Sequence, residues 1–444
     1  MKEITFASKG FFDEIASRPQ RHVHLIVIAT KPDIIKQVPL YRELKKRGHI
    51  AVLGHTGQHY SENLSGGMLK EFGVEPDFNL NAAGHHYEVV AQIIQRLGWV
   101  MAELKQRGKI VIPYVHGDTT TAMAASNAGY CNGFASVHVE AGIRTLTPDY
   151  EKAKKQKILH GGQVDAEAWY RFLQDRNHWK RGSLEPYPEQ FNTRASEAAT
   201  GIHLAPVELD REFLLAEGFP EDRIEVVGNS VVDATAEAVA NAKSSTIFDR
   251  YPQLADGDFV RFCIHRRENC GSDRRFKAIW DALVSFVKEG RTVLLISMFQ
   301  TESAFKRLGL VDEVHELAKK YPTFIYSPVW PQYTDVIAVM QRAALCATDS
   351  GSMQEEMNAL DVPCATLRFG SDRSESIISG GNTIVPPTDG PTVRALLLHA
   401  WDNKAMRDAP RIYGHNVSGP SIDFVESILA REEIFRDEEA RLGL

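Results

Sequence analysis

The stretch VHGDTTTAMAASNAGYCNGFASVHVEAGIRT, residues 115–145, decides the fold. It overlaps the end of an apolar run, KIVIPYV at residues 109–115, whose composition predicts a buried strand. Residues 123–130 predict the next helix, and residues 134–139 predict a second strand. The segment therefore predicts a strand–helix–strand unit of an open parallel α/β sheet.

Polar side chains gather at the ends of these two predicted strands. His116 and Asp118 follow the first strand, whereas His138 lies in the second, which ends on Glu140 with Arg144 four residues on. Ligands bind at the carboxyl ends of strands in an open parallel sheet, so we expect these groups at one such edge. Helix capping is the alternative role for the two acidic residues, and spacing alone does not separate the two roles.

Length and composition are those of a globular protein with two domains, at 444 residues, 43% hydrophobic and 25% charged. The net charge of −7 argues against a nucleic-acid surface. The first 22 residues carry no apolar signal segment, and no apolar run is long enough to span a membrane, so we expect a cytoplasmic protein. The five cysteines form no CxxC pair, which predicts free thiols and no zinc site: Cys131, Cys263, Cys270, Cys346 and Cys364.

Two strand–turn–helix junctions predict anion sites. The strand 24–30 leads into a helix that begins at Lys31, with Lys36 one turn further on. In the second half, the strand 344–348 leads into DSGSMQEE, residues 349–356. Free backbone N–H groups at a helix start bind phosphate groups. The second turn would use the small residues Ser350, Gly351 and Ser352.

The second half of the chain repeats the alternation of strands and helices, which predicts a second doubly wound domain. Its strand at residues 259–264 ends at HRREN, residues 265–269, which places His265 and Arg266 at another strand end. No GxGxxG pattern follows a strand, so a tightly held dinucleotide is not expected.

The pair HGDTTT and HVEAGIRT resembles the UDP-N-acetylglucosamine 2-epimerase family, the non-hydrolysing bacterial type especially. Further blocks of that family recur in order. They are similar to G-T-R-P-E-x-I-K at residues 29–36, P-E-E-x-N-R at 188–193, T-G-N-T-x-x-D-A at 227–234, H-R-R-E-N at 265–269 and R-x-x-T-E-R-P-E at 368–375. The resemblance implies a GT-B-like fold, in which two doubly wound, Rossmann-like domains face a cleft.

The resemblance, with the patterns above, implies a set of site residues. The catalytic residues would be Asp118, Glu140, Glu189 and His265. The substrate-binding residues would be Lys31, Lys36, His116, Arg144, Asn192, Arg266, Ser350, Gly351, Ser352, Glu356 and Arg373, with Glu356 on the ribose hydroxyls.

This chain departs from the family pattern at several of these blocks. The replacements are Lys31 for Arg, Asp33 for Glu, Gln190 for Glu, Thr193 for Arg, Ser352 for Gly, Ser374 for Pro, and Ser297–Gln300 where relatives carry H-x-N-P. Gln58-His59 resembles a segment that in some members helps form a regulatory site for a second substrate molecule. The residues after His59 differ from that version, so allosteric regulation is not expected.

The expected domain boundaries are 1–21 for an N-terminal extension, 22–206 for the first domain, 207–415 for the second, and 416–444 for a C-terminal helix that crosses back to the first. The first domain would contain an insertion at about 146–186, where the family uses roughly ten residues. Connections of this length are lids, interface arms or surface insertions, and all three stay open.

The reaction implied by the resemblance is epimerisation at C2 of a UDP-N-acetylhexosamine, from UDP-GlcNAc to UDP-ManNAc, by elimination of UDP and re-addition to a bound glycal. It needs no metal and no cofactor. The alternatives are a hydrolysing 2-epimerase that releases ManNAc and UDP, a GT-B glycosyltransferase, and a sugar-nucleotide sensor with a decayed site. The expected partners are a UDP-sugar and a second copy in a homodimer, with no nucleic acid and no membrane.

Overall fold

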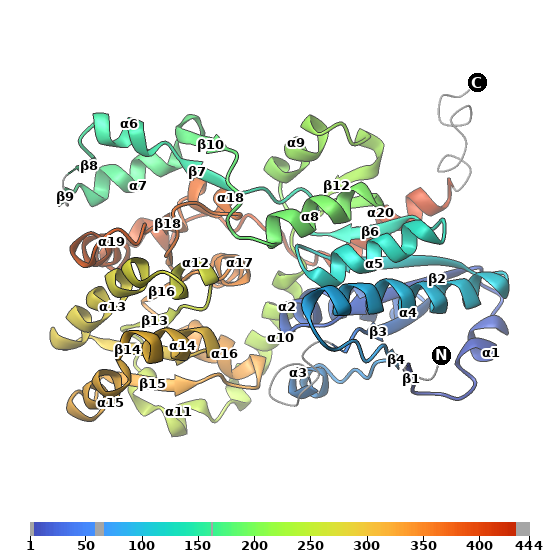
Figure 1. Ribbon diagram of the computed structural model, residues 1–444, viewed down its shortest axis with the longest axis horizontal. Helices are drawn as coiled ribbons and strands as arrows, with labels where there is room; N and C mark the ends of the chain where they lie inside the picture. The colour runs from blue at the N-terminus through green and yellow to red at the C-terminus, as the bar shows by residue number, and fades with distance from the viewer. Residues whose placement is uncertain (1–3, 58–65, 161–162, 432–444) are drawn as a thin grey trace. The chain divides into compact units, whose positions relative to one another are not determined.

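The computed structural model describes residues 4–57, 66–160 and 163–431. The Gln58-His59 segment and the last residues of the C-terminal tail lie outside this part of the chain. The chain forms two compact units (Figure 1). Unit 1 comprises Met1–Ile143, Tyr187–Ala234 and Gly414–Leu444, and unit 2 comprises Arg144–Pro186 and Thr235–Tyr413.

Unit 1 is built on an eight-stranded sheet that is parallel except for its short first strand. In sheet order its strands are β1 Thr5–Phe6, β4 Phe78–Asn79, β3 Ile50–His55, β2 His22–Ile28, β5 Ile110–His116, β6 Ser136–Val139, β11 Thr200–Ala205 and β12 Ile224–Val226. The central strands β2, β3 and β5 are buried almost throughout, as expected for parallel strands covered on both faces.

The helices of unit 1 cover this sheet (Figure 1). They are α1 Phe11–Ala16, α2 Lys31–Lys46, α3 Gly67–Glu71, α4 His86–Gln106, α5 Thr120–Cys131, α8 Glu189–Ala198, α9 Glu208–Ala216, the first turn of α10 Val231–Asn241, and α20 Ser418–Leu429, with the 3-10 turn η3 Glu221–Arg223. Helix α20, from the C-terminal end of the chain, packs on α2, where Arg47 forms ion pairs with Asp423 at 2.7 Å and Glu426 at 2.9 Å.

Unit 2 contains a six-stranded, fully parallel sheet. In sheet order its strands are β15 Phe324–Pro328, β14 Thr292–Ser297, β13 Phe259–Cys263, β16 Leu345–Thr348, β17 Cys364–Thr366 and β18 Asn382–Ile384. Side chains of β13 alternate between two apolar cores: Val260 and Phe262 enter one, and Phe259 and Cys263 the other. The sheet is therefore covered by helices on both faces.

The helices of unit 2 follow the same alternation along the chain. They are α11 Ile247–Arg250, α12 Arg267–Cys270, α13 Asp273–Lys288, α14 Phe299–Leu308, α15 Val311–Lys320, α16 Tyr333–Met340, α17 Ser352–Ala359, α18 Ser374–Ile378 and α19 Gly390–Asp402, with the 3-10 turns η4 Ala242–Ser244, η5 Pro252–Leu254 and η6 Lys404–Met406.

The insertion forms a small substructure of its own in unit 2. Its elements are β7 Leu146–Pro148, α6 Tyr150–Lys155, β8 Leu159–His160, β9 Gln163–Val164, α7 Ala166–Gln174, η2 Arg176–His178 and β10 Trp179–Arg181. Helix α7 packs beside β18, α18 and α19 (Figure 1). Its apolar face, with Trp169, Phe172 and Leu173 buried, belongs to a core of unit 2.

These contacts correct the domain assignment made from the sequence, which places the insertion inside the first domain at 22–206. The insertion clusters with unit 2 because the aromatic face of α7 completes the apolar core beside β18 and α19. Chain order alone does not reveal which sheet such a face will cover.

None of the described helices is long and apolar enough to cross a membrane. Of the five cysteines, Cys131 is exposed and the other four are buried, and all five are free thiols.

We predict that Trp169→Ala lowers the free energy of unfolding by about 3–5 kcal/mol, because it removes a fully buried indole from the core of unit 2. Urea denaturation followed by circular dichroism measures the change. Tyr87→Ala, at a side chain that is 72% exposed, is the control and should cost under about 0.5 kcal/mol. An equally small loss at Trp169 would mean that the insertion is a loosely attached surface segment.

Candidate active site

A buried carboxylate, Glu140, lies at the end of β6 in unit 1. Its oxygens contact Lys36 Nζ, Asn229 Nδ2 at 2.5 Å and His116 Nε2 at 3.1 Å. Glu140 itself has a φ of +64°, a conformation that non-glycine residues rarely adopt. The turn after β5 comes close to it, since a Cβ on Gly117 would lie 3.0 Å from Glu140 Oε2. The backbone of two neighbouring strand ends is thus arranged around one carboxylate.

His116 continues this cluster toward the start of α2. Its Nδ1 donates to Asp33 Oδ1 at 2.9 Å. The other oxygen of Asp33 accepts from the backbone N–H groups of Ala29 at 3.1 Å and Thr30 at 2.8 Å, as part of the capping box of α2. Asp33 therefore connects the helix start to the histidine.

The electrostatics of the cluster follow from these contacts. Burial alone would lower the pKa of His116, but the negative charge of Glu140 and the hydrogen bonds to Asp33 and Glu140 outweigh burial and raise that pKa to about 9. His116 is then protonated at neutral pH, and two cations, Lys36 and His116, balance two carboxylates, Asp33 and Glu140. We call these four residues the buried charge cluster.

The other predicted carboxylates of unit 1 are more exposed. Asp118 lies half-buried in the turn between β5 and α5, and Glu189 is the half-buried first residue of α8. Asn192 connects the two elements, because its Nδ2 donates to the backbone carbonyl of Asp118 at 3.1 Å. Lys31, the first residue of α2, is partly buried. Burial lowers its pKa, although the negative charge of Glu71 acts in the opposite direction.

Two further residues support the Glu140 turn: His138, which was expected at this edge of the sheet, and Glu197, which was not predicted. His138 Nε2 donates to the carbonyl of Gly117 at 2.7 Å. Glu197, buried in α8, accepts from the backbone N–H of Gly142 at 2.6 Å and lies 3.8 Å from His138 Nδ1. Asn229 is also a contact of Glu140 that was not predicted, although its T-G-N-T-like block was recognisable in the sequence.

In unit 2, Asp349 holds the turn that carries His265. Its carboxylate accepts from the backbone N–H groups of His265 at 2.9 Å and Arg266 at 3.0 Å, and from Asn269 Nδ2 at 3.0 Å. Burial lowers the pKa of His265 to about 4, aided by nearby arginines that include Arg266 and opposed by Asp349. His265 is therefore neutral at neutral pH.

The start of α17 gathers the predicted phosphate-binding residues. Ser350 and Gly351 precede the helix and Ser352 begins it, so N–H groups of its first turn lack partners within the helix. A Cβ on Gly351 would lie 3.5 Å from Arg373 Cζ, which places that guanidinium beside the turn. Arg373 Nε donates to Glu355 Oε1 at 2.5 Å.

One turn into α17, Glu356 accepts from Ser352 Oγ at 3.3 Å and from Tyr333 Oη at 3.4 Å. Its carboxylate is buried against this helix start. The geometry is compatible with the predicted role of Glu356 as an acceptor for ribose hydroxyls.

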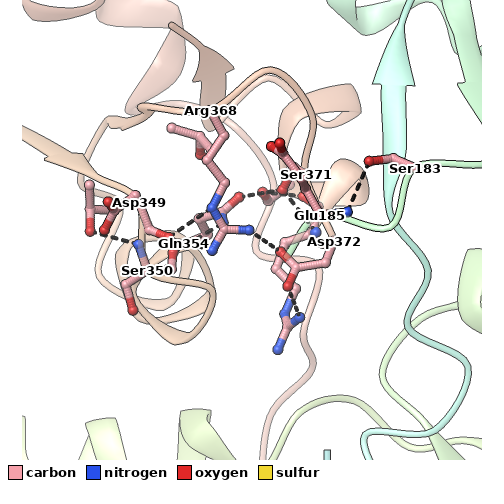
Figure 2. Close-up of polar contacts among 12 residues, drawn as sticks. Ser183, Glu185, Asp349, Ser350, Gln354, Arg368, Ser371 and Asp372 are labelled. Carbon is pink, nitrogen blue, oxygen red and sulfur yellow. Dashed lines mark hydrogen bonds and ion pairs between the residues drawn. The ribbon is translucent and has the colours of Figure 1, made fainter. Parts of the chain in front are cut away.

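Figure 2 shows how Arg368 supports the same region. Its Nε donates to the carbonyl of Asp349 at 2.7 Å, and its Nη1 donates to Asp372 Oδ1 at 2.8 Å. Burial by itself would raise the pKa of Asp372, but Arg368, Arg373 and Arg266 outweigh burial and lower it to about 2. Asp372 is therefore ionised at neutral pH.

The structure thus distributes the predicted site residues over two clusters. Lys31, Lys36, His116, Asp118, Glu140, Glu189 and Asn192 belong to unit 1, and His265, Arg266, Ser350, Gly351, Ser352, Glu356 and Arg373 to unit 2. Arg144, which is buried and lies two residues before the insertion, clusters with unit 2. Among the residues that the structure describes, no group of three or more His, Cys, Asp or Glu side chains could hold a metal ion.

We predict a pH dependence of stability from His116. A pKa raised from 6.5 to about 9 on folding stabilises the protein fully below pH 6.5, and the contribution is lost as the pH rises through 9. The loss amounts to about 3 kcal/mol. Urea denaturation at several pH values between 6 and 10 measures it, and His116→Gln should flatten the curve.

His24→Gln is the matched control, because burial lowers the pKa of His24 to about 3 and leaves it neutral over this pH range. An unchanged pH dependence in His116→Gln would contradict a protonated His116.

This chain is similar in sequence to known proteins. A family model described as UDP-N-acetylglucosamine 2-epimerase matches residues 42–152 and 178–424. The UDP-N-acetylglucosamine 2-epimerase of Methanocaldococcus jannaschii is 29% identical over 378 residues, which cover 84% of this chain and 90% of the relative. The enzyme of the same name from Bacillus subtilis is 28% identical over 417 residues, which cover 91% of this chain and 94% of the relative.

The chain is also similar in fold to solved structures. The crystal structure of Methanocaldococcus jannaschii UDP-GlcNAc 2-epimerase in complex with UDP-GlcNAc and UDP has a TM-score of 0.73 at 26% identity, covering 92% of this chain and 99% of that one. The Neisseria meningitidis UDP-GlcNAc 2-epimerase bound to UDP-GlcNAc has a TM-score of 0.72 at 22% identity, covering 92% and 100%, and supports the fold.

The α/β, GT-B-like fold class with two Rossmann-like units, predicted from the sequence, is confirmed by these neighbours. The family model covers well over half of the chain and skips residues 153–177 of the insertion. The chain belongs to the UDP-N-acetylglucosamine 2-epimerase family, a family of isomerases.

Proposed function

We propose that this protein inverts C2 of a UDP-N-acetylhexosamine and so interconverts UDP-N-acetylglucosamine and UDP-N-acetylmannosamine. The observation that carries the proposal is the buried Glu140, held between Lys36 and His116 at the end of β6. A carboxylate so deeply buried, with a strained backbone and three polar partners, is costly to maintain, which points to a role in chemistry.

The proposed reaction is an elimination followed by its reversal on the other face of the sugar. A carboxylate removes the C2 proton while the C1–O bond to UDP breaks; the C–H electrons form the C1=C2 double bond, and the bonding pair at C1 leaves with UDP. UDP then re-adds to C1, and a proton is returned to the opposite face of C2. Asp118, Glu140 and Glu189 are the proposed carboxylates, all from unit 1.

Negative charge develops on the departing diphosphate, and unit 2 offers the groups that stabilise it. The N-terminus of α17 presents backbone N–H groups, and Arg373 lies beside Gly351 at that turn. His265, being neutral, can donate one hydrogen bond to a phosphate oxygen without adding a charge. The proposed ribose contact is Glu356.

The buried charge cluster gives the proposed sugar site a fixed electrostatic environment. Glu140 and Asp33 raise the pKa of His116, and His116 and Lys36 in turn place positive charge beside the Glu140 carboxylate. Because the groups are already ordered before substrate binds, little reorganisation is needed during the reaction.

The test is an NMR assay with UDP-N-acetylglucosamine in deuterium oxide. Deuterium at C2, with UDP-N-acetylmannosamine in equilibrium, is the expected result. Free N-acetylmannosamine and UDP would instead assign the hydrolysing reaction. UDP binding without C2 exchange would overturn the proposal and favour a glycosyltransferase or a sensor.

We predict that Glu140→Gln lowers kcat by about 10²–10⁴-fold, because it removes a charged group in the proposed reaction site. The affinity for UDP should stay within about twofold of wild type, since the proposed diphosphate contacts belong to unit 2. The C2-exchange assay and isothermal titration calorimetry measure the two quantities.

Glu43→Gln is the control for charge alone. Glu43 pairs with Lys46 and Arg47 on the surface of α2, so this change should leave kcat unaffected. A fully active Glu140→Gln variant would exclude Glu140 from the reaction.

The homodimer and the cytoplasmic location expected from the sequence belong to this proposal. Light scattering coupled to gel filtration tests the first, and a molar mass of one chain, 49.6 kDa, would contradict it.

A further inference from the structure

The loop at residues 368–373, which we call the arginine loop, follows β17 and ends on Arg373. On its inner side it is bound to the α17 region of unit 2. Ser371 Oγ donates to Gln354 Oε1 at 2.7 Å, and Arg373 N donates to Ser371 Oγ at 2.9 Å (Figure 2). The position of the Arg373 guanidinium beside the α17 turn therefore depends on where this loop is held.

The outer side of the arginine loop is held by the insertion. Leu146 and Ser371 exchange two backbone hydrogen bonds, both 3.0 Å long. Tyr150 Oη donates to the carbonyl of Phe369 at 2.8 Å. The approach is close: a Cβ on Gly370 would lie 2.7 Å from the carbonyl oxygen of Leu146. The insertion thus contacts three consecutive residues of the loop.

The far end of the insertion adds a side-chain contact. Glu185 accepts from both Nη atoms of Arg275, at 3.1 and 3.3 Å. The guanidinium of Arg275 lies 4.7 Å from the centroid of the Phe369 ring. Phe369 is therefore held by a hydrogen bond to its carbonyl and by a cation over its ring.

The insertion is itself anchored in the core of unit 2. The ring of Tyr150 stacks on Trp169 with centroids 5.6 Å apart, and Trp169 Nε1 donates to the carbonyl of Ile384 at 2.8 Å. Trp169 lies within residues 153–177, which the family model does not match. A fully buried indole bound to β18 is a fixed support, unlike the hinge of a mobile lid.

We propose that the insertion is a brace that fixes the arginine loop and thereby sets the affinity for the diphosphate of the nucleotide sugar. The second half of this statement rests on the proposed function, in which Arg373 binds that diphosphate. The physical reason is preorganisation: a loop already held in its binding conformation loses less conformational entropy when ligand binds.

The experiment compares two tyrosines of the insertion that make the same kind of bond. Tyr150→Phe deletes the hydroxyl bound to Phe369 in the arginine loop. Tyr170→Phe deletes the hydroxyl bound to the carbonyl of Gly380 at 2.9 Å, which lies outside the loop. Each variant keeps its ring, and each loses one hydrogen bond to a backbone carbonyl of unit 2.

The first readout needs no ligand. Hydrogen–deuterium exchange of the amides of Ser371 and Arg373, both hydrogen-bonded in the loop, should be about threefold or more faster in Tyr150→Phe and unchanged in Tyr170→Phe. Unchanged exchange in Tyr150→Phe would overturn the brace. Glu185→Gln, at a side chain 43% exposed, repeats the test with no buried group removed, and should also speed exchange.

The second readout is the Kd for UDP by isothermal titration calorimetry. It should rise about three- to tenfold in Tyr150→Phe and stay at the wild-type value in Tyr170→Phe. In the C2-exchange assay KM should rise with kcat unchanged, because binding and not the chemical step is affected. Faster loop exchange with an unchanged Kd would overturn the link to nucleotide affinity.

The brace and the proposed function can fail separately. A wild-type protein that does not bind UDP contradicts the proposed function, and the link to nucleotide affinity falls with it. Loop exchange in the unliganded variants still decides whether the insertion holds the arginine loop.

Discussion

Two acidic and two basic side chains are buried together in unit 1. Because their charges must neutralise one another, the helix and the strand ends that carry them have to lie side by side. An uncompensated charge in a protein interior costs several kcal/mol, so Asp33, Lys36, His116 and Glu140 must all be in place at once. They come from the first two turns of α2, the end of β5 and the end of β6 (Figure 1). The order β2-β5-β6 in the sheet brings these ends side by side.

The same constraint accounts for the unusual backbone around Glu140. A positive φ at a glutamate costs of order 1 kcal/mol or more and persists only where its surroundings enforce it. Here the carboxylate is fixed by His116, Lys36 and Asn229, while Glu197 holds the following turn through the N–H of Gly142. The stabilising contacts of the buried carboxylate offset the strain of the turn that presents it.

Part of this site follows from the sequence. Apolar runs ending in polar residues predict strand ends, and the family blocks single out Glu140, His116 and Lys36. The roles of Asp33 and Glu197 were not predictable in the same way. An acidic residue in the first turn of a helix is expected for capping whether or not it also faces a histidine, and Glu197 meets Gly142 only after 55 residues of chain.

The packing of the insertion is a further feature that the sequence predicts only in part. Apolar residues at helical spacing predict α7 and its buried face, but not the surface that this face covers. The partner, beside β18 and α19, lies more than 200 residues further along the chain. The charged residues of α6 do not reveal this contact either, because Glu151, Lys154 and Lys155 are exposed while the neighbouring Tyr150 contacts Phe369.

The two units also use their acidic groups differently, which bears on the proposed chemistry. In unit 1 the carboxylate of Glu140 is held by side-chain cations. In unit 2 the carboxylate of Asp349 is taken up by backbone N–H groups of the His265 turn, and Arg368 binds a backbone carbonyl. Asp349 therefore fixes the His265 turn, while the N–H groups of α17 and the cation of Arg373 lie together at the adjacent helix start.

An elimination needs ionised carboxylates near carbon and preorganised positive charge near the leaving diphosphate. In the proposed function, the buried charge cluster of unit 1 would supply the first requirement and the N-terminus of α17 in unit 2 the second.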